Sequence, residues 1–471
     1  MRVPNAGQGS ILALLMLALL CTAAASVSAH AYGPNIADDC CTDLEQRVAE
    51  LEATVATKGN RTLKVTLTGL VNNAVMYWND GGEDNAYVVT NDNQRSRFAF
   101  VGTVAISPNW EAGYAIDIGI RTANSKLVTQ TAAGGFDERP PTGFDLRSSV
   151  WFLRNKRFGS GYLGTAFAAT DRIASSNVTQ TEAFDAYSAP ENAGLGMFLR
   201  SSRNGEMTQS LLSWRRIIGA GGDQPGESQR GFSLMKYVSP TWNGFTFAAD
   251  WVVTDFWDVA LRYRKEIAGF DVAAGIGFLQ LQPGSRTRSV CPAAFFTRGE
   301  DATACQQVRG SVSAKHLDTG LFVNFGANLT NDGIVDTTVR FDGTGVEQQG
   351  YFLAGQIGIE RQFNALGKST LYASYYSYSG GAPTVLTVGP GDPLNPTGSG
   401  DWTVWQSNVD IWGGGIAQGI DNAAMIVYLA YHHVSGDLTL RQLQNRVASG
   451  PIAGAPIDDL DLLLGGALIR F

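Results

Sequence analysis

The sequence predicts an all-β fold, a transmembrane antiparallel β-barrel of sixteen or eighteen strands preceded by a short N-terminal helical segment. Three observations predict it. Hydrophobic and polar residues alternate with a period of two from Leu63 onward. Only 17% of the 471 residues are charged, whereas 44% are hydrophobic. Beyond the N-terminal region, no apolar run approaches the about 18 residues that a transmembrane helix needs.

The composition excludes several classes of protein. A formal net charge of −8 argues against a strongly basic nucleic-acid binder. An aromatic content of 10% is too high for a disordered chain, and five cysteines are too few for a disulfide or zinc scaffold. The sequence contains no Gly-x-Ser-x-Gly, His-Glu-x-x-His or phosphate-loop motif. We therefore expect no enzyme activity, no cofactor and no metal site.

Residues 1–31 have the features of a signal peptide. Arg2 supplies the positive start, Ile11–Leu20 the apolar core, and Ala29-His30-Ala31 a cleavage site. Cys21 raises the alternative of a lipoprotein signal, but Leu20 stands where that signal needs Gly, Ala or Ser. We therefore expect export into an oxidising compartment.

Residues 32–61 form a polar leader that contains a short heptad pattern. Apolar residues at 44, 48, 51 and 55 are spaced as in a coiled-coil seam, and Asp43 can cap the helix. A helix this short is not stable alone in water. It either packs on its own domain or joins other subunits in a small coiled coil. The adjacent Cys40 and Cys41 either link subunits or stay reduced.

Residues 62–471 form the expected barrel domain, and Trp110–Arg121 shows its pattern most clearly. The even-numbered positions of this segment are apolar, whereas the odd-numbered positions are polar or small. A soluble β-sandwich can show the same alternation. Strand lengths of about nine to twelve residues, alternating short and long connections, and aromatic residues at strand ends favour a barrel in lipid. Such a barrel must be closed, because hydrocarbon cannot satisfy the backbone groups of an open edge.

The connections set the expected number of strands. Short connections at 108–109, 156–161, 203–206, 239–244, 266–269, 317–320, 364–368 and 421–423 separate long ones at 80–94, 122–145, 170–194, 217–229, 281–308, 331–349, 380–400 and 437–459. A further connection lies near Thr254. Counted directly, these connections give eighteen strands. Sixteen strands remain if the irregular hairpin at 195–217 is not part of the wall.

Several motifs resemble those of one protein family. The chain ends in an apolar strand closed by Phe471, and Lys58-Gly59-Asn60-Arg61 follows the heptads. Arg97 lies in Arg-Phe-Ala-Phe-Val-Gly, and residues 157–164 form a Phe-Gly turn that enters a strand. Together these motifs resemble the Gram-negative outer-membrane porins, particularly the alphaproteobacterial type with a short N-terminal coiled coil, over residues 43–471. The resemblance implies a homotrimer in the bacterial outer membrane, in contact with lipid and lipopolysaccharide.

The resemblance also implies a charged pore constriction. In these porins the third loop folds into the lumen, and residues 170–194 stand in its place. Acids on this loop would face bases on the wall, so that water and polar solutes pass while apolar ones are excluded. The expected residues are the wall bases Arg97, Arg121 and Arg147, with Arg95 and Arg154 less favoured, and the loop acids Asp171, Glu182, Asp185 and Glu191. The alternative is that these charges are solvated loop or rim residues.

The expected function is passive diffusion of small hydrophilic solutes and ions through this constriction. The alternative is a substrate-selective channel for a particular sugar or organic anion, whose lumen would carry a track of aromatic side chains. The candidates for such a track are Tyr372, Tyr376, Tyr378, Trp402 and Trp405, although a place in the aromatic girdle is favoured. A membrane-embedded hydrolase is disfavoured, because no catalytic motif accompanies the histidines at 316, 432 and 433.

Two loops carry further expectations. Cys291 and Cys305 lie in the loop 281–308, and an oxidising compartment favours a disulfide between them. Closing that loop would contribute about 3 kcal/mol in the chain-entropy model. The acidic loop Asp80-Gly81-Gly82-Glu83-Asp84 either binds Ca²⁺ or the divalent ions that bridge lipopolysaccharide, or is simply solvated.

Overall fold

A computed structural model describes residues 54–58, 61–134, 143–218, 232–252, 256–281, 305–332, 349–380, 386–444 and 450–471. The expected signal peptide, the heptad positions up to residue 53, Cys40, Cys41 and Cys291 lie outside the described residues. The side chains of Arg121 and Cys305 lie outside them too. The disulfide and the coiled coil therefore stay predictions.

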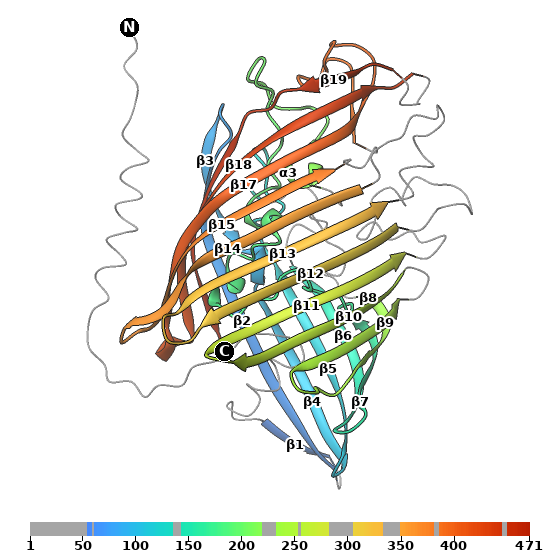
Figure 1. The fold of residues 1–471 in the computed structure, drawn as a ribbon, viewed down its shortest axis with the longest axis vertical. Helices are drawn as coiled ribbons and strands as arrows, with labels where there is room; N and C mark the ends of the chain where they lie inside the picture. The colour runs from blue at the N-terminus through green and yellow to red at the C-terminus, as the bar shows by residue number, and fades with distance from the viewer. Residues whose placement is uncertain are drawn as a thin grey trace. The chain divides into compact units, whose positions relative to one another are not determined.

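The described strands form one closed antiparallel barrel with sixteen wall strands (Figure 1). Two wall strands are interrupted: β3 (Asp84–Thr90) and β4 (Arg97–Ser107) both pair with β2 (Arg61–Asn79), and β19 (Ile452–Ala455) and β20 (Leu460–Arg470) both pair with β18 (Met425–Gln442). The pairing of β2 with β20 closes the barrel. The remaining wall strands are β5 (Trp110–Arg121), β6 (Gly143–Asn155), β7 (Gly159–Ala166), β8 (Phe232–Val238), β9 (Phe245–Val252), β10 (Phe256–Ile267), β11 (Phe270–Leu281), β12 (Cys305–His316), β13 (Leu321–Asp332), β14 (Gln349–Asn364), β15 (Gly367–Gly380) and β17 (Trp402–Ile420).

Of the two strand numbers that the sequence allows, sixteen is confirmed. The hairpin at 195–217 does form, but it is not part of the wall. Phe198 pairs with Ser213, and Arg200 pairs with Met207, as isolated bridges. The turn expected at 203–206 joins the two arms of this inner hairpin. The expected long connection at 80–94 is also wrong in its extent, because residues 84–90 of it form β3.

The barrel has an inside-out distribution of polarity. On β13, Leu321, Val323 and Phe325 are exposed, whereas Asn324 between them is buried. Strands β9 to β11 show the same alternation of exposed apolar and buried polar residues. A soluble protein buries its apolar side chains, so this arrangement is that of a transmembrane β-barrel.

The aromatic girdle is only partly as expected. Trp110, Trp257 and Trp412 are exposed, as a girdle at the membrane interface requires. Trp402, for which a place in the girdle was favoured, is only 1% exposed and lies with Trp78 in an interior hydrophobic cluster, so that assignment is wrong.

The end of the leader is extended rather than helical. Residues Thr54–Lys58 form β1, which pairs with the start of β2. Val55, the last expected heptad position, therefore lies on a strand. Backbone pairing with β2 outweighs the helical preference of a segment that is too short to be stable alone. A second short strand, β16 (Thr387–Val388), pairs with the first residues of β17.

The connection between β7 and β8 turns back onto the inner face of the wall. We call its described part, residues 167–218, the inward segment. It carries η2 (Gln180–Ala183), η3 (Pro190–Ala193) and α3 (Trp214–Ile217), and α3 lies beside β17 (Figure 1). Among the described residues, no helix is both long enough and apolar enough to cross a membrane.

The inward segment has a polar half and an apolar half. The polar half, residues 167–194, contacts the wall mainly through hydrogen bonds. The apolar half, residues 195–218, buries Leu195, Met197 and Trp214 against apolar inward-facing residues of the wall, including Val409 and Val434. The barrel therefore contains a hydrophobic core on the inner side of its wall, and this core fills part of the lumen.

Candidate pore constriction

The polar half of the inward segment lies along the inner wall in an extended path. The backbone N–H of Ser176 donates to Ser311 Oγ of β12 at 2.9 Å, and that of Gln180 donates to Glu360 Oε2 of β14 at 2.7 Å. Farther along, Gln356 Nε2 donates to the carbonyl of Asp185 at 2.9 Å. The wall strands already pair with one another, so the backbone groups of the segment bond to side chains of the wall instead.

Glycines on the inner wall make room for this path. A Cβ added to Gly326 of β13 would lie 2.2 Å from the carbonyl oxygen of Ala174, and one added to Gly275 of β11 would lie 2.6 Å from Ile173 Cδ1. At Gly326 the obstacle is backbone, so the segment can approach the wall there only because the side chain is missing; at Gly275 an added Cβ would require the Ile173 side chain to shift.

The wall itself bends inward between β3 and β4. Residues 91–96 contain η1 (Asp92–Gln94) and are buried, although they are polar. Asn93 Nδ2 donates to the carbonyl of Phe184 at 2.8 Å, and the N–H of Ala186 donates to Asn93 Oδ1 at 3.1 Å. This wall excursion therefore contacts the inward segment. This excursion was not predicted, although the polar run Asn91-Asp92-Asn93-Gln94 between two strands could have indicated it.

Two of the expected wall bases share one acid. Arg147 Nε lies 3.1 Å from Asp117 Oδ2, and Arg97 Nε lies 3.8 Å from the same oxygen. Asp117 lies on the polar face of β5, which pairs with β4 and β6, the strands that carry Arg97 and Arg147. Its place in the apolar–polar alternation of β5 could therefore have predicted it as their partner. Arg147 is only 8% exposed, and its guanidinium also lies over the ring of Phe167.

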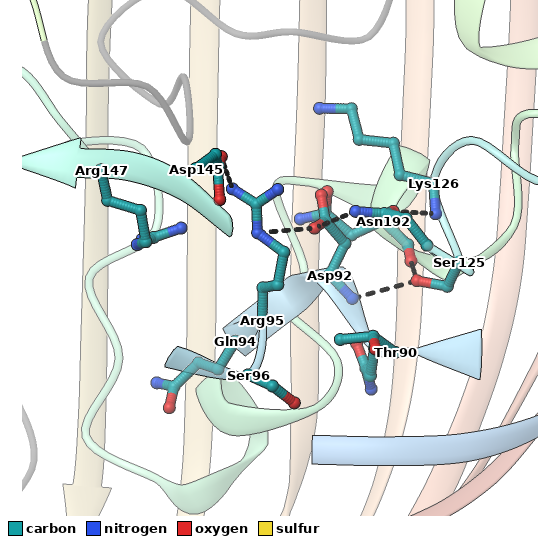
Figure 2. A network of polar contacts seen from close by, with 12 residues as sticks. Thr90, Asp92, Gln94, Arg95, Ser96, Ser125, Lys126, Asp145, Arg147 and Asn192 are labelled. Atoms are coloured by element: carbon teal, nitrogen blue, oxygen red, sulfur yellow. Dashed lines mark hydrogen bonds and ion pairs between the residues drawn. The ribbon is translucent and has the colours of Figure 1, made fainter. Parts of the chain in front are cut away.

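Arg95 lies in a second ion-pair group next to the first (Figure 2). Its Nη2 is 3.1 Å from Asp145 Oδ2, and its Nε is 3.9 Å from Asp92 Oδ1. In the same view, Ser125 donates to the carbonyl of Asn192 at 2.5 Å and so connects the β5–β6 loop to the inward segment. Arg154 is elsewhere: it pairs with Glu111 at 3.4 Å near the short turn between β6 and β7.

Three of the four expected loop acids are buried, two of them in ion pairs and one beside a histidine. Glu182 pairs with Arg172 at 2.8 Å and Glu191 with Lys126 at 3.8 Å, while Asp185 Oδ1 lies 3.3 Å from His432 Nε2. These acids are therefore not solvated rim residues. The fourth acid, Asp171, is only partly buried, and its carbonyl accepts a hydrogen bond from Arg262 at 2.6 Å. Lys126, Arg172 and His432 were not predicted, because only the folded chain brings them to these acids.

The tyrosines proposed as an aromatic track are covered. Tyr372 and Tyr376 are buried on the inner side of β15, and the Tyr372 hydroxyl donates to Asp185 Oδ2 at 2.6 Å. Phe184 of the inward segment stacks on Tyr428 with ring centroids 4.8 Å apart. A solute in the lumen would therefore meet the inward segment rather than these rings.

Asp80 in the acidic outer loop acts as an anchor for the inner hairpin. It is 2% exposed and accepts hydrogen bonds from Arg200 Nη2 at 2.9 Å and Gln130 Nε2 at 3.0 Å. Burial raises the pKa of Asp80. The hydrogen bonds from Arg200, Gln130 and the N–H groups of Glu83 and Gly82 lower it by more, so that the pKa of Asp80 lies below its usual range. Within the described residues, no group of three or more His, Cys, Asp or Glu could hold a metal ion.

This lowered pKa predicts acid sensitivity of the loop. Because the folded pKa lies below the unfolded value of about 3.9, the stabilisation is complete above that value and is lost as the pH falls through the folded pKa. Asp80→Asn should reduce the local stability of residues 80–90 by about 2 kcal/mol at neutral pH and remove the acid dependence. Hydrogen exchange corrected for intrinsic rates measures both effects. Equal protection in wild type and variant at neutral pH would contradict the prediction.

Comparisons with known proteins identify the family of the chain and show a likeness of fold. A family model described as Gram-negative porin matches residues 13–445. An anion-selective porin from Comamonas acidovorans is similar with a TM-score of 0.50 and 14% identity, over 87% of this chain and 100% of that one. OmpT, an outer membrane protein of Vibrio cholerae, gives 0.48 and 10%, over 88% and 99%. OmpF of Salmonella typhi in complex with daunomycin gives 0.45 and 13%, over 87% and 98%. No curated protein matches the sequence.

Proposed function

Because this chain belongs to the Gram-negative porin family and is an outer-membrane channel for passive diffusion, we propose that the inward segment and the wall excursion form its charged constriction. The family and the fold are those of a channel rather than an enzyme. One observation carries the proposal: charges from the wall, the wall excursion, the β5–β6 loop and the inward segment meet around η1.

The signs of these charges suggest how the constriction sorts solutes. Each cation of the group lies beside an acid. The group has four cations and four acids: Arg95, Arg97, Lys126 and Arg147, and Asp92, Asp117, Asp145 and Glu191. Such alternating charges orient water and polar solutes and exclude apolar ones. Because their sum is zero, we propose that the passage has weak ion selectivity and separates small hydrophilic solutes mainly by size.

Removing one cation from this balance should change ion selectivity. In Arg147→Ala, Asp117 retains Arg97 at 3.8 Å and loses its closer partner at 3.1 Å. The permeability ratio of cation to anion should rise about twofold, measured as a reversal potential in a salt gradient. Arg157→Ala is the matched control, because Arg157 is exposed in the short turn after β6. Equal reversal potentials for wild type and Arg147→Ala would contradict the assignment.

Solute flux separates the two kinds of channel. A general diffusion pore gives a flux that rises linearly with concentration and falls with solute size. A channel selective for one sugar or organic anion saturates, because its binding sites fill. We expect linear flux across a panel of sugars and organic acids, since the Tyr372 hydroxyl is bonded to Asp185 of the inward segment and Tyr376 is buried. Saturation with one solute would favour the selective channel instead.

We also propose a homotrimer whose apolar outer face contacts lipid and lipopolysaccharide. The exposed apolar residues of the wall support contact with lipid, and the apolar spacing at 44, 48 and 51 supports association near the leader. Native mass spectrometry in detergent tests this proposal. A trimer is expected, and a stable monomer would contradict it.

A further inference from the structure

The inward segment exposes very little of its surface to the lumen. Within the described stretch 166–201, Arg172 is the only exposed residue. Its side chain keeps 45% of its surface exposed, against 11% for its ion-pair partner Glu182. Because this stretch lies on the inner face of the wall, a solute beside it would meet Arg172 rather than the buried acids Glu182, Asp185 and Glu191.

The backbone on both sides of Arg172 is bonded to the wall without help from its side chain. The N–H of Thr170 donates to Asp258 Oδ2 of β10 at 2.8 Å. The carbonyl of Ile173 accepts from Ser311 Oγ of β12 at 2.6 Å, and Ile173 itself is 0% exposed. Removal of the Arg172 side chain would therefore leave the segment against the wall.

A tight turn turns Arg172 away from its buried neighbours. The N–H of Ile173 donates to the carbonyl of Thr170 at 3.0 Å, and the N–H of Ser175 donates to the carbonyl of Arg172 at 3.0 Å. Arg172 has φ 54°, in the left-handed region that favours glycine over arginine. Strained backbone of this kind is concentrated at functional positions. An arginine at a position that favours glycine is therefore a sign that its side chain has a function.

The guanidinium of Arg172 is held at two points. Its Nη1 lies 2.8 Å from Glu182 Oε1, and its Nη2 donates to the carbonyl of Asn93 at 3.0 Å. Asn93 belongs to the wall excursion, next to Asp92, which lies 3.9 Å from Arg95 in the charged group of the constriction. The side chain thus reaches from the segment to the excursion. A planar guanidinium bonded on two sides keeps one position and does not swing aside freely.

We propose that Arg172 sets the size limit of the channel: its side chain forms one edge of the narrowest opening, and passing solutes contact it. The inference rests on the proposed function, since it assumes that solutes cross between the inward segment and the wall excursion. The Arg172–Glu182 pair adds one charge of each sign, so the charge balance of the passage is unchanged. Arg172 therefore selects solutes by their size rather than by their charge.

Liposome swelling with the full-length protein and uncharged sugars of increasing size tests this role. Arg172→Gly removes the side chain and suits the left-handed backbone, so the barrel should stay folded. The relative rate for the largest sugar that wild type admits should rise about threefold in this variant. Arg203→Ala is the matched control. Arg203 is an exposed arginine of the inner hairpin that donates to the carbonyls of Asn395 and Gly454. This control should keep the wild-type size limit.

Glu182→Gln separates the bulk of Arg172 from its ion pair. This substitution removes the carboxylate charge but leaves the Arg172 side chain in the passage, with its bond to Asn93. Its size limit should equal that of wild type. A limit raised as far as in Arg172→Gly would show that the ion pair sets the width, and would overturn the proposal.

The remaining outcomes distinguish Arg172 from the constriction as a whole. An unchanged size limit in Arg172→Gly would overturn the role of Arg172 while leaving the proposed constriction intact. Wild-type flux without any size limit would instead overturn the constriction. The heat resistance of the folded barrel in gel electrophoresis should be the same in Arg172→Gly as in wild type. Its loss would show that the side chain holds the structure together, and would also contradict the proposal.

Discussion

Gly326→Val is expected to lower the single-channel conductance and to destabilise the inward segment. A Cβ at this position would lie 2.2 Å from the carbonyl oxygen of Ala174 and 3.1 Å from the ring of Tyr187. The nearest obstacle is backbone, so it cannot turn away as a flexible side chain does. The segment must move off the wall toward the centre of the lumen, which narrows the passage. Overpacking of this kind costs about 1–3 kcal/mol.

Gly161→Val is the matched control for this substitution. Gly161 lies on β7, is exposed, and has no atom within 4 Å of an added Cβ. The control should fold and conduct as wild type does. If Gly326→Val showed wild-type conductance and wild-type heat stability, the inward segment would not lie against β13 as described.

Trp214→Ala is expected to detach the apolar half of the inward segment from the wall while leaving the barrel folded. Trp214 is 1% exposed. Its backbone N–H, which the alanine variant keeps, donates to the carbonyl of Met197 at 3.1 Å. Its ring reaches Gly436 of β18, where an added Cβ would lie 3.1 Å from Cζ3. Truncating a fully buried tryptophan to alanine costs about 3–5 kcal/mol. The substitution therefore lowers the free energy of local unfolding of residues 195–218. The barrel itself stays folded, because the wall strands keep their backbone pairing.

Limited trypsin digestion measures this opening. Arg203, Arg215 and Arg216 offer cleavage sites in the segment, and they should be cut much faster in Trp214→Ala than in wild type. Trp242→Ala is the control, because Trp242 is 78% exposed in the turn between β8 and β9. Equal cleavage of Trp214→Ala and Trp242→Ala would show that the inner core does not hold the segment.

The wall was predictable from the sequence because lipid leaves few choices. Every backbone group must pair within the sheet, so alternation, turn spacing and strand length together determine a closed barrel. The remaining choice between sixteen and eighteen strands depended on residues 195–217. Leu195, Met197 and Leu199 alternate as in a wall strand, but their apolar side chains pack on the inner face of the wall. Alternation alone cannot distinguish these two environments.

The constriction was predictable only in part, because its contacts join residues far apart in the chain. The basic residues at 97 and 147 and the acids of the loop were identified from motifs, yet their partners were not. Asp185 lies beside His432, and Asn91 Nδ2 donates to the Tyr428 hydroxyl at 3.0 Å. The two residues of each pair are far apart along the chain. Such pairs arise only when the wall closes and brings β2 beside β20.

Planar-bilayer recording of the refolded protein gives the most direct test of the channel and its constriction. Wild type should insert as stable pores with ohmic current, a small reversal potential in a salt gradient, and block by solutes above a size limit. A folded protein that inserts without conducting would contradict the channel. A conductance as large as that of an unobstructed sixteen-stranded barrel would contradict an inward segment that narrows it.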